Sequence, residues 1–199
     1  MSDLYDPLEY SNLTRHLVRE LMDQKETSLP IKESFAGPGV YALFYNGDFE
    51  PYVQWDQVSL EQPIYVGKAV PPGSRKGGVS KSINPKDQPL FKRLAEHSKS
   101  IDSAKNLSTG QFLCRYLTVV PLWITAAERF LIEHYRPLWN VCIEGFGNHN
   151  PGSGRHQGEI SWWDALHPGR PWAAKLRRTR SQEQAITRLD SYFQENLNS

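Results

Sequence analysis

Apolar residues recur at helical spacing near both ends of the chain. The first such stretch covers residues 7–25 and the last covers residues 181–197. Each places its apolar positions on one stripe, which predicts an amphipathic helix. Ser181 and Gln184 also have the spacing of a capping box at the start of the second helix. Acidic residues precede the first helix, so we expect it to pack against the core or a second subunit rather than against phosphate.

The middle of the chain contains three β-rich runs, over residues 39–45, 64–66 and 112–120. Turn residues bound the first two runs, which indicates antiparallel strands. The connection over residues 49–62 is longer than a tight hairpin requires, so we expect an inserted hairpin loop there. Its aromatic residues fit a loop that reads DNA and equally fit a loop that packs against the core.

Two more helices are predicted, one over residues 89–98 and one between Pro121 and Pro137. In the second, Thr125 and Glu128 have the spacing of a capping box, which by itself explains Glu128 as a helix cap. Together the elements predict an α+β fold. Its centre is a small three-stranded antiparallel sheet flanked by helices, with an N-terminal helix, the inserted hairpin loop and a C-terminal extension.

Composition narrows the picture through the distribution of charge. The chain has 199 residues, is 39% hydrophobic and has a net charge of +1, which suits a single globular unit and says nothing about nucleic acid. Between Lys68 and Lys99, however, eight basic residues stand against two acidic ones. This segment fits a face that meets phosphates, although a solvated lysine-rich loop would have the same composition. The two cysteines are too few for a disulfide framework, and no leader is visible, so we expect a cytoplasmic protein.

Six side chains of the middle segment carry the candidate chemistry. Tyr41 and Tyr65 lie in the first two predicted strands, so their phenols would stand side by side. Arg93 and His97 are four residues apart and therefore share one helix face. The set ends with Glu128 and Asn140.

The order Gly39-Val40-Tyr41, Tyr65-Val66-Gly67-Lys68, Arg93 with His97, a helix Glu and a terminal Asn resembles the GIY-YIG nuclease superfamily. The resemblance covers about residues 36–143, which would form the catalytic core between an N-terminal helical arm (residues 1–35) and a C-terminal extension (residues 144–199). The Gly-Arg-His and Trp-Trp stretches of that extension make the chain most similar to the GIY-YIG type II restriction endonucleases.

The resemblance implies a role for each catalytic residue. Glu128 would hold one Mg²⁺ ion at the scissile phosphate, for which Mn²⁺ could substitute, and Arg93 would bind that phosphate. We assign the general base to Tyr41 assisted by His97, and positioning of the water to Tyr65. Asn140 would hold the site together through hydrogen bonds.

The DNA-binding surface is predicted from basic residues and their neighbours. Lys68 directly follows the motif Tyr65-Val66-Gly67. The other predicted residues lie in Gly-rich and Pro-rich stretches or among aromatic residues, which suit a surface that follows a duplex. The predicted set is Lys68, Arg75, Lys76, Arg155, His156, Arg170, Lys175, Arg177 and Arg178.

Three functions compete on the sequence. The first is a restriction endonuclease that cuts double-stranded DNA as a homodimer at a palindrome, because one site cuts one strand and two-fold symmetry supplies the other. The resemblance implies a G·C-rich site such as CCGCGG and a cognate DNA methyltransferase in the same prokaryotic cell. The alternatives are a GIY-YIG nuclease in repair or homing, and a non-catalytic nucleic-acid-binding module with the same fold.

Overall fold

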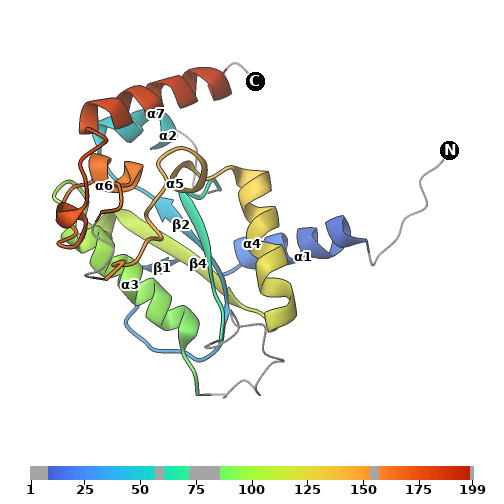
Figure 1. Cartoon of the computed structure of the whole chain (residues 1–199). Helices are drawn as coiled ribbons and strands as arrows, with labels where there is room; N and C mark the ends of the chain where they lie inside the picture. Colours follow the sequence, from blue (N-terminus) through green and yellow to red (C-terminus); the bar gives the residue numbers. More distant parts are fainter. Residues whose placement is uncertain (1–8, 57–60, 72–85, 153–156, 198–199) are drawn as a thin grey trace.

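A four-stranded antiparallel sheet forms the centre of the protein (Figure 1). The computed structural model describes residues 9–56, 61–71, 86–152 and 157–197. The strands are β1 (Thr27–Ser28), β2 (Gly39–Tyr45), β3 (Tyr65–Ala69) and β4 (Phe112–Thr118), in the spatial order β1-β4-β2-β3. Each pair of neighbours is antiparallel. β3 is thus an edge strand and β2 lies beside it in the interior of the sheet.

The predicted α+β fold is confirmed, with corrections at the strands. β2 has the predicted bounds, whereas β3 continues to Ala69 and β4 ends at Thr118 rather than at Val120. The fourth strand, β1, was not predicted, because two residues are too few to show an alternation of apolar and polar positions.

β2 is buried along its whole length because both faces of the sheet are covered. Tyr41 and Leu43 point to the face that also holds α3 and the C-terminal helices. Val40, Ala42 and Phe44 point to the opposite face, where they pack with residues of α1 and α4. Successive side chains of a strand alternate between the two faces, so the seven residues of β2 contribute to two separate cores.

Helices cover both faces of the sheet. The segments are α1 (Tyr10–Met22), α3 (Pro89–Ser103), α4 (Pro121–Tyr135) and α5 (Leu138–Val141), with a short 3-10 turn, η3, at Thr109–Gln111. α1 packs on α4 through Val18 and Leu21, which fulfils the expectation that it would contact the core. Figure 1 shows α3 on one side of the sheet and α4 with α1 on the other. No helix of the described residues is long and apolar enough to cross a membrane.

One prediction about local structure is wrong, and one alternative explanation is removed. The connection after β2 is not a hairpin in its described part: it forms a 3-10 turn, η1 (Glu50–Tyr52), and a short helix, α2 (Val53–Asp56). α4 begins at Pro121, which is pre-set for the first helical turn. Glu128 therefore lies inside the helix and does not cap its start, so the capping-box explanation is removed.

The inserted segment is anchored by a chain of buried hydrogen bonds. Trp139 donates its Nε1–H to Tyr52 Oη at 2.8 Å, and Tyr52 Oη lies 2.6 Å from His167 Nε2. His167 Nδ1 lies 2.9 Å from Asn106 Oδ1. Burial lowers the pKa of His167 to about 3, so its ring is neutral. Its Nε2 accepts a hydrogen bond from the Tyr52 hydroxyl, and its Nδ1–H donates one to Asn106 Oδ1. The described part of the insertion thus packs against the core.

The C-terminal segments pack into the same core as the sheet. They comprise α6 (Trp162–Leu166), the 3-10 turn η5 (Ala173–Lys175) and α7 (Gln182–Leu197). Trp163 of α6 and Leu189 of α7 belong to the hydrophobic cluster that contains Tyr41. The predicted capping box is present, because Ser181 and Gln184 exchange side-chain and backbone hydrogen bonds.

Replacing Tyr52 by Phe tests the buried chain. Removal of the hydroxyl leaves the Trp139 donor and the His167 acceptor without their partner, so the free energy of unfolding should fall by about 1–3 kcal/mol. Urea denaturation at neutral pH measures the change. Tyr116→Phe, which alters a phenol that is much less buried, should stay within about 0.5 kcal/mol of the wild type. Equal stability of Tyr52→Phe and wild type would contradict the assigned network.

Candidate active site

Pairing of β2 with β3 brings the two tyrosines together. Tyr41 lies opposite Gly67, Tyr65 lies opposite Leu43, and the two phenol rings are 6.2 Å apart. The Tyr41 ring lies across Gly67, where an added Cβ would clash with the Tyr41 hydroxyl. The glycine of the second motif is therefore required by the tyrosine of the first.

The helix α3 places Arg93 and His97 against these phenols. His97 is 1% exposed, and its Nε2 lies 2.5 Å from Tyr41 Oη. Arg93, one helical turn earlier, is 17% exposed in its side chain and lies at the rim of the site. The four-residue spacing predicted one shared face, and the structure brings both residues to the tyrosines from that face.

Burial keeps the Tyr41–His97 pair uncharged. Burial raises the pKa of Tyr41 well above its ordinary value, the neighbouring Tyr65 adds to this, and Arg93 opposes it. Burial also lowers the pKa of His97 well below its ordinary value, with the Arg93 charge acting in the same direction. At neutral pH the pair is thus a phenol and a neutral imidazole. Forming a phenolate here requires additional positive charge next to Tyr41.

Glu128 and Lys68 form an ion pair on the other side of β3. Lys68 Nζ lies 2.7 Å from Glu128 Oε2, and both side chains are partly exposed. Successive residues of β3 alternate between faces, so Lys68 meets α4 while Tyr65 meets α3. Burial raises the pKa of Tyr65, Arg93 lowers it, and the Glu128 charge raises it further. The Glu128 charge therefore acts on the phenol electrostatically, and the candidate site includes residues on both sides of the edge strand.

Asn140 holds this edge strand. Its Oδ1 accepts a hydrogen bond from Val66 N at 2.8 Å, and its Nδ2 donates to Val66 O at 2.9 Å. Trp139 N donates to Ile64 O at 2.9 Å, just before the strand begins. The amide of Asn140 thus occupies the backbone groups that a further strand would have paired, and its hydrogen bonds fix the position of Tyr65 and Lys68 on either side of Val66.

A loop at residues 145–150 forms a wall of the site that the sequence did not predict. Phe146 stacks on His97 with ring centroids 4.4 Å apart and meets the edge of Tyr65 at 4.9 Å. Arg93 donates from Nη2 to Gly147 O at 2.8 Å. On the other edge of the guanidinium, His149 Nε2 lies 2.7 Å from Arg93 Nη1. The Gly-Asn-His-Asn composition marked this stretch as a loop, but no local pattern indicated its partner.

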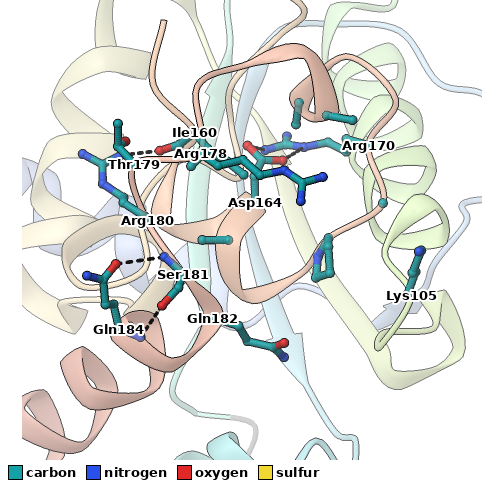
Figure 2. Close-up of a pocket in the computed structure, with 15 residues that line it drawn as sticks. Lys105, Ile160, Asp164, Arg170, Arg178, Thr179, Arg180, Ser181, Gln182 and Gln184 are labelled. Carbon is teal, nitrogen blue, oxygen red and sulfur yellow. Dashed lines mark hydrogen bonds and ion pairs between the residues drawn. The ribbon is translucent and has the colours of Figure 1, made fainter.

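Arg170 supports this loop from inside the protein, which corrects the prediction that it contacts DNA. The residue is 3% exposed, and its Nε and Nη2 donate to the two carboxylate oxygens of Asp164 at 2.6 and 2.7 Å (Figure 2). The guanidinium lies between the rings of Trp163 and Trp172. It also donates to the backbone carbonyl oxygens of Gly145, Phe146 and Asn148. With its polar atoms occupied in this way, Arg170 fixes the loop and cannot reach DNA.

Lys68 pairs with Glu128, whereas the remaining predicted DNA-binding residues lie on the C-terminal segments or outside the described part of the chain. Residues 72–85 and 153–156 are not described, and these ranges contain Arg75, Lys76, Arg155 and His156. Lys175, Arg177 and Arg178 are exposed. Arg178, Arg180 and Lys105 line a pocket of about 720 Å³ at the start of α7 (Figure 2), and none of the candidate catalytic residues lines it.

The candidate site combines two tyrosines on paired strands with an Arg and a His on the next helix and a Glu on the helix after β4. This combination is of the GIY-YIG nuclease type. A sequence model of the family described as the Eco29kI GIY-YIG domain matches residues 33–192. The chain therefore belongs to this family of GIY-YIG restriction endonucleases, which are nucleases acting on DNA. The match includes Arg170 and most of α7. No curated protein sequence matches the chain.

Replacing Gly147 by Ala tests the contact between the loop and the site. An added Cβ would lie 2.6 Å from Tyr65 Oη and 3.3 Å from Arg93 Nη2, so both side chains would have to shift. We expect a folded protein whose rate of DNA cleavage falls by about tenfold to a hundredfold, because small displacements of reacting groups are costly. The matched control is Gly110→Ala, whose Cβ meets only Ser108 Oγ at 3.8 Å. Equal rates of DNA cleavage for the two variants would show that the loop contact does not contribute to catalysis.

Proposed function

We propose that the protein is a sequence-specific type II restriction endonuclease that hydrolyses phosphodiester bonds in double-stranded DNA with Mg²⁺. The observation that carries the proposal is the convergence of the predicted catalytic residues on both sides of one edge strand. Tyr41, Tyr65, Arg93 and His97 lie on one side, and Glu128 lies on the other. Family membership supports the same conclusion.

The proposed chemistry uses the chain's own residues for positioning and proton transfer. Arg93 binds the scissile phosphate and offsets the charge that develops on its oxygens. Tyr65 positions the attacking water, and Tyr41 takes the proton of that water. The phenol proton of Tyr41 passes to His97 Nε2, which lies within hydrogen-bond distance of it. Because burial disfavours the resulting charges, this transfer depends on the cationic groups that surround a bound phosphate.

Glu128 is the proposed holder of the metal ion. Among the described residues no group of three or more His, Cys, Asp or Glu side chains is placed to hold a metal ion, and Glu128 is the one carboxylate that we propose as a ligand. Mg²⁺ commonly binds to one or two carboxylates and completes its shell with water and substrate phosphate oxygens, and one carboxylate beside a phosphate fits this habit. When bound, the ion supplies positive charge next to the nucleophile and the phosphate. Lys68 Nζ pairs with Glu128 Oε2 at 2.7 Å, so Lys68 would be available to a DNA phosphate if Glu128 held the ion.

The proposed assembly is a homodimer on a palindromic site. One catalytic centre cuts one strand, and two-fold symmetry places a second centre on the other strand. We propose a G·C-rich palindrome such as CCGCGG and a cognate DNA methyltransferase that protects host DNA in the prokaryotic cytoplasm. Lys175, Arg177 and Arg178 are proposed contacts to the DNA backbone, and the basic pocket beside Arg178 offers room for a phosphate.

Incubation of purified protein with plasmid DNA and Mg²⁺ tests the proposed function. Discrete fragments that disappear after methylation of the recognition site are the expected result. Nicked or smeared products would instead support a GIY-YIG nuclease in repair or homing. A mobility shift with uncut DNA would point to a binding module.

Glu128→Ala should lower the rate of DNA cleavage by about a hundredfold or more, because the charge stabilisation at the scissile phosphate depends on one ion. Binding of the cognate duplex should persist, since it rests on many other phosphate and base contacts. Filter binding and cleavage assays on the same preparation separate the two effects. Glu133→Ala is the matched control, because this exposed carboxylate lies on the same helix and pairs with Arg129 at the surface. Cleavage by Glu128→Ala at the wild-type rate would remove the metal role.

Tyr41→Phe should lower the single-turnover rate of cleavage by about 10²- to 10⁴-fold, because it removes a general base. If Tyr41 had only a structural role, the substitution would lower the free energy of unfolding by about 1 kcal/mol or somewhat more and leave the cleavage rate unchanged. His97→Ala should shift the pH-rate profile toward alkaline pH, where the phenol ionises without help. Quenched-flow cleavage across pH, with melting temperatures and with Tyr116→Phe as control, measures both effects. A Tyr41→Phe protein that cuts at the wild-type rate would assign the base to another group.

A further inference from the structure

The guanidinium of Arg93 has an inner edge and an outer edge with different partners. At the inner edge, Nη2 donates to Gly147 O at 2.8 Å. At the outer edge, Nη1 lies 2.7 Å from His149 Nε2 and 3.1 Å from Glu96 Oε2. The inner contact is fixed, because Arg170 holds the carbonyl groups on both sides of Gly147.

The outer edge is open to the surface. The side chains of His149 and Glu96 are 56% and 53% exposed, whereas that of Arg93 is 17% exposed. Exposed ion pairs of this kind contribute little to stability, so an incoming anion can displace them. A phosphate oxygen that reaches Arg93 from solvent therefore arrives at Nη1, next to the imidazole of His149.

The hydrogen bond between Arg93 Nη1 and His149 Nε2 indicates which of the two atoms carries the proton before DNA binds. An arginine has no acceptor atom, so Arg93 donates and His149 Nε2 accepts, which requires a neutral ring. A phosphate oxygen at the same place is an acceptor, and it repels the Glu96 carboxylate. The imidazole then gains by taking one proton from solvent and donating its Nε2–H to the phosphate.

We propose that His149 is a further phosphate-binding residue of this active site, which contacts the DNA phosphate beside Arg93 and takes up one proton when DNA binds. The proposal rests on the nuclease function argued above. In the free protein His149 shares the outer edge of Arg93 with Glu96, and in the complex it changes from acceptor to donor. The group that His149 contacts is a phosphodiester, so the proposed ligand is the DNA backbone.

Several charged or titratable groups face His149. Arg93 disfavours its protonation and Glu96, 3.8 Å away, favours it. His97 lies behind Arg93, but burial holds the pKa of His97 well below its ordinary value. Arg170 lies beneath the loop and is neutralised by Asp164. The incoming phosphate adds negative charge and so tips the balance toward the imidazolium.

The test is binding of a cognate duplex without divalent metal, measured by fluorescence anisotropy from about pH 8 to about pH 6. Uptake of one proton should tighten wild-type binding by up to about tenfold per pH unit. His149→Asn keeps a donor but cannot titrate, so this pH dependence should disappear. At about pH 6, His149→Ala should bind about tenfold more weakly than wild type, as expected for loss of a hydrogen bond to a charged group. The control is His16→Asn, which alters an exposed histidine of α1.

Cleavage measurements distinguish failure of this proposal from failure of the nuclease function. If wild type cuts DNA and His149→Asn keeps the wild-type affinity and pH dependence, the role of His149 is overturned alone. Absence of any pH dependence in wild-type binding overturns it as well. Wild type that neither binds nor cuts DNA overturns both proposals. Melting temperatures equal to wild type are expected for all three variants, because each changes an exposed side chain.

Discussion

The catalytic arrangement depends on the hydrogen bonds between Asn140 and Val66. An edge strand leaves one row of backbone groups without a neighbouring strand, and a five-residue strand has little else to keep it in register. The Asn140 amide supplies both a donor and an acceptor at Val66, the second residue of β3. Because side chains alternate along a strand, this one point fixes Tyr65 on one face and Lys68 on the other, and through Lys68 it fixes the ion pair with Glu128.

The local parts of the site could be predicted from sequence, and the parts made by distant segments could not. Tyr41 and Tyr65 lie in short β-rich runs, and the spacing of Arg93 and His97 alone places them on one helix face. The role of Glu128 is ambiguous from the sequence, because its spacing to Thr125 fits a helix cap. The start of α4 at Pro121 excludes that role. The roles of His149 and Arg170 have no such local signal. Arg93 is 56 residues from His149, and the loop carbonyl groups that Arg170 holds are 22 to 25 residues from it, so tertiary folding sets both contacts.

The described part of the chain contains two buried pairs of tyrosine and histidine with different surroundings. Tyr52 and His167 are closed off by Trp139 and Asn106, so their hydrogen bonds are all internal. The charge of Arg93 affects the pKa of both Tyr41 and His97, and the charge of Glu128 raises the pKa of Tyr41. The same two side chains therefore form a packing element in one place and the proposed proton-transfer pair in the other, and the two pairs differ in their neighbouring charges.

The support of the 145–150 loop by Arg170 has a consequence for how the enzyme is made. Arg170 takes its place only when α6 is folded, and α6 packs against α7 near the C-terminus through Trp163 and Leu189. During synthesis both tyrosines, Arg93, His97 and Glu128 precede these segments in the chain. We therefore expect the wall that holds Arg93 to form only after α6 and Arg170 have folded into place.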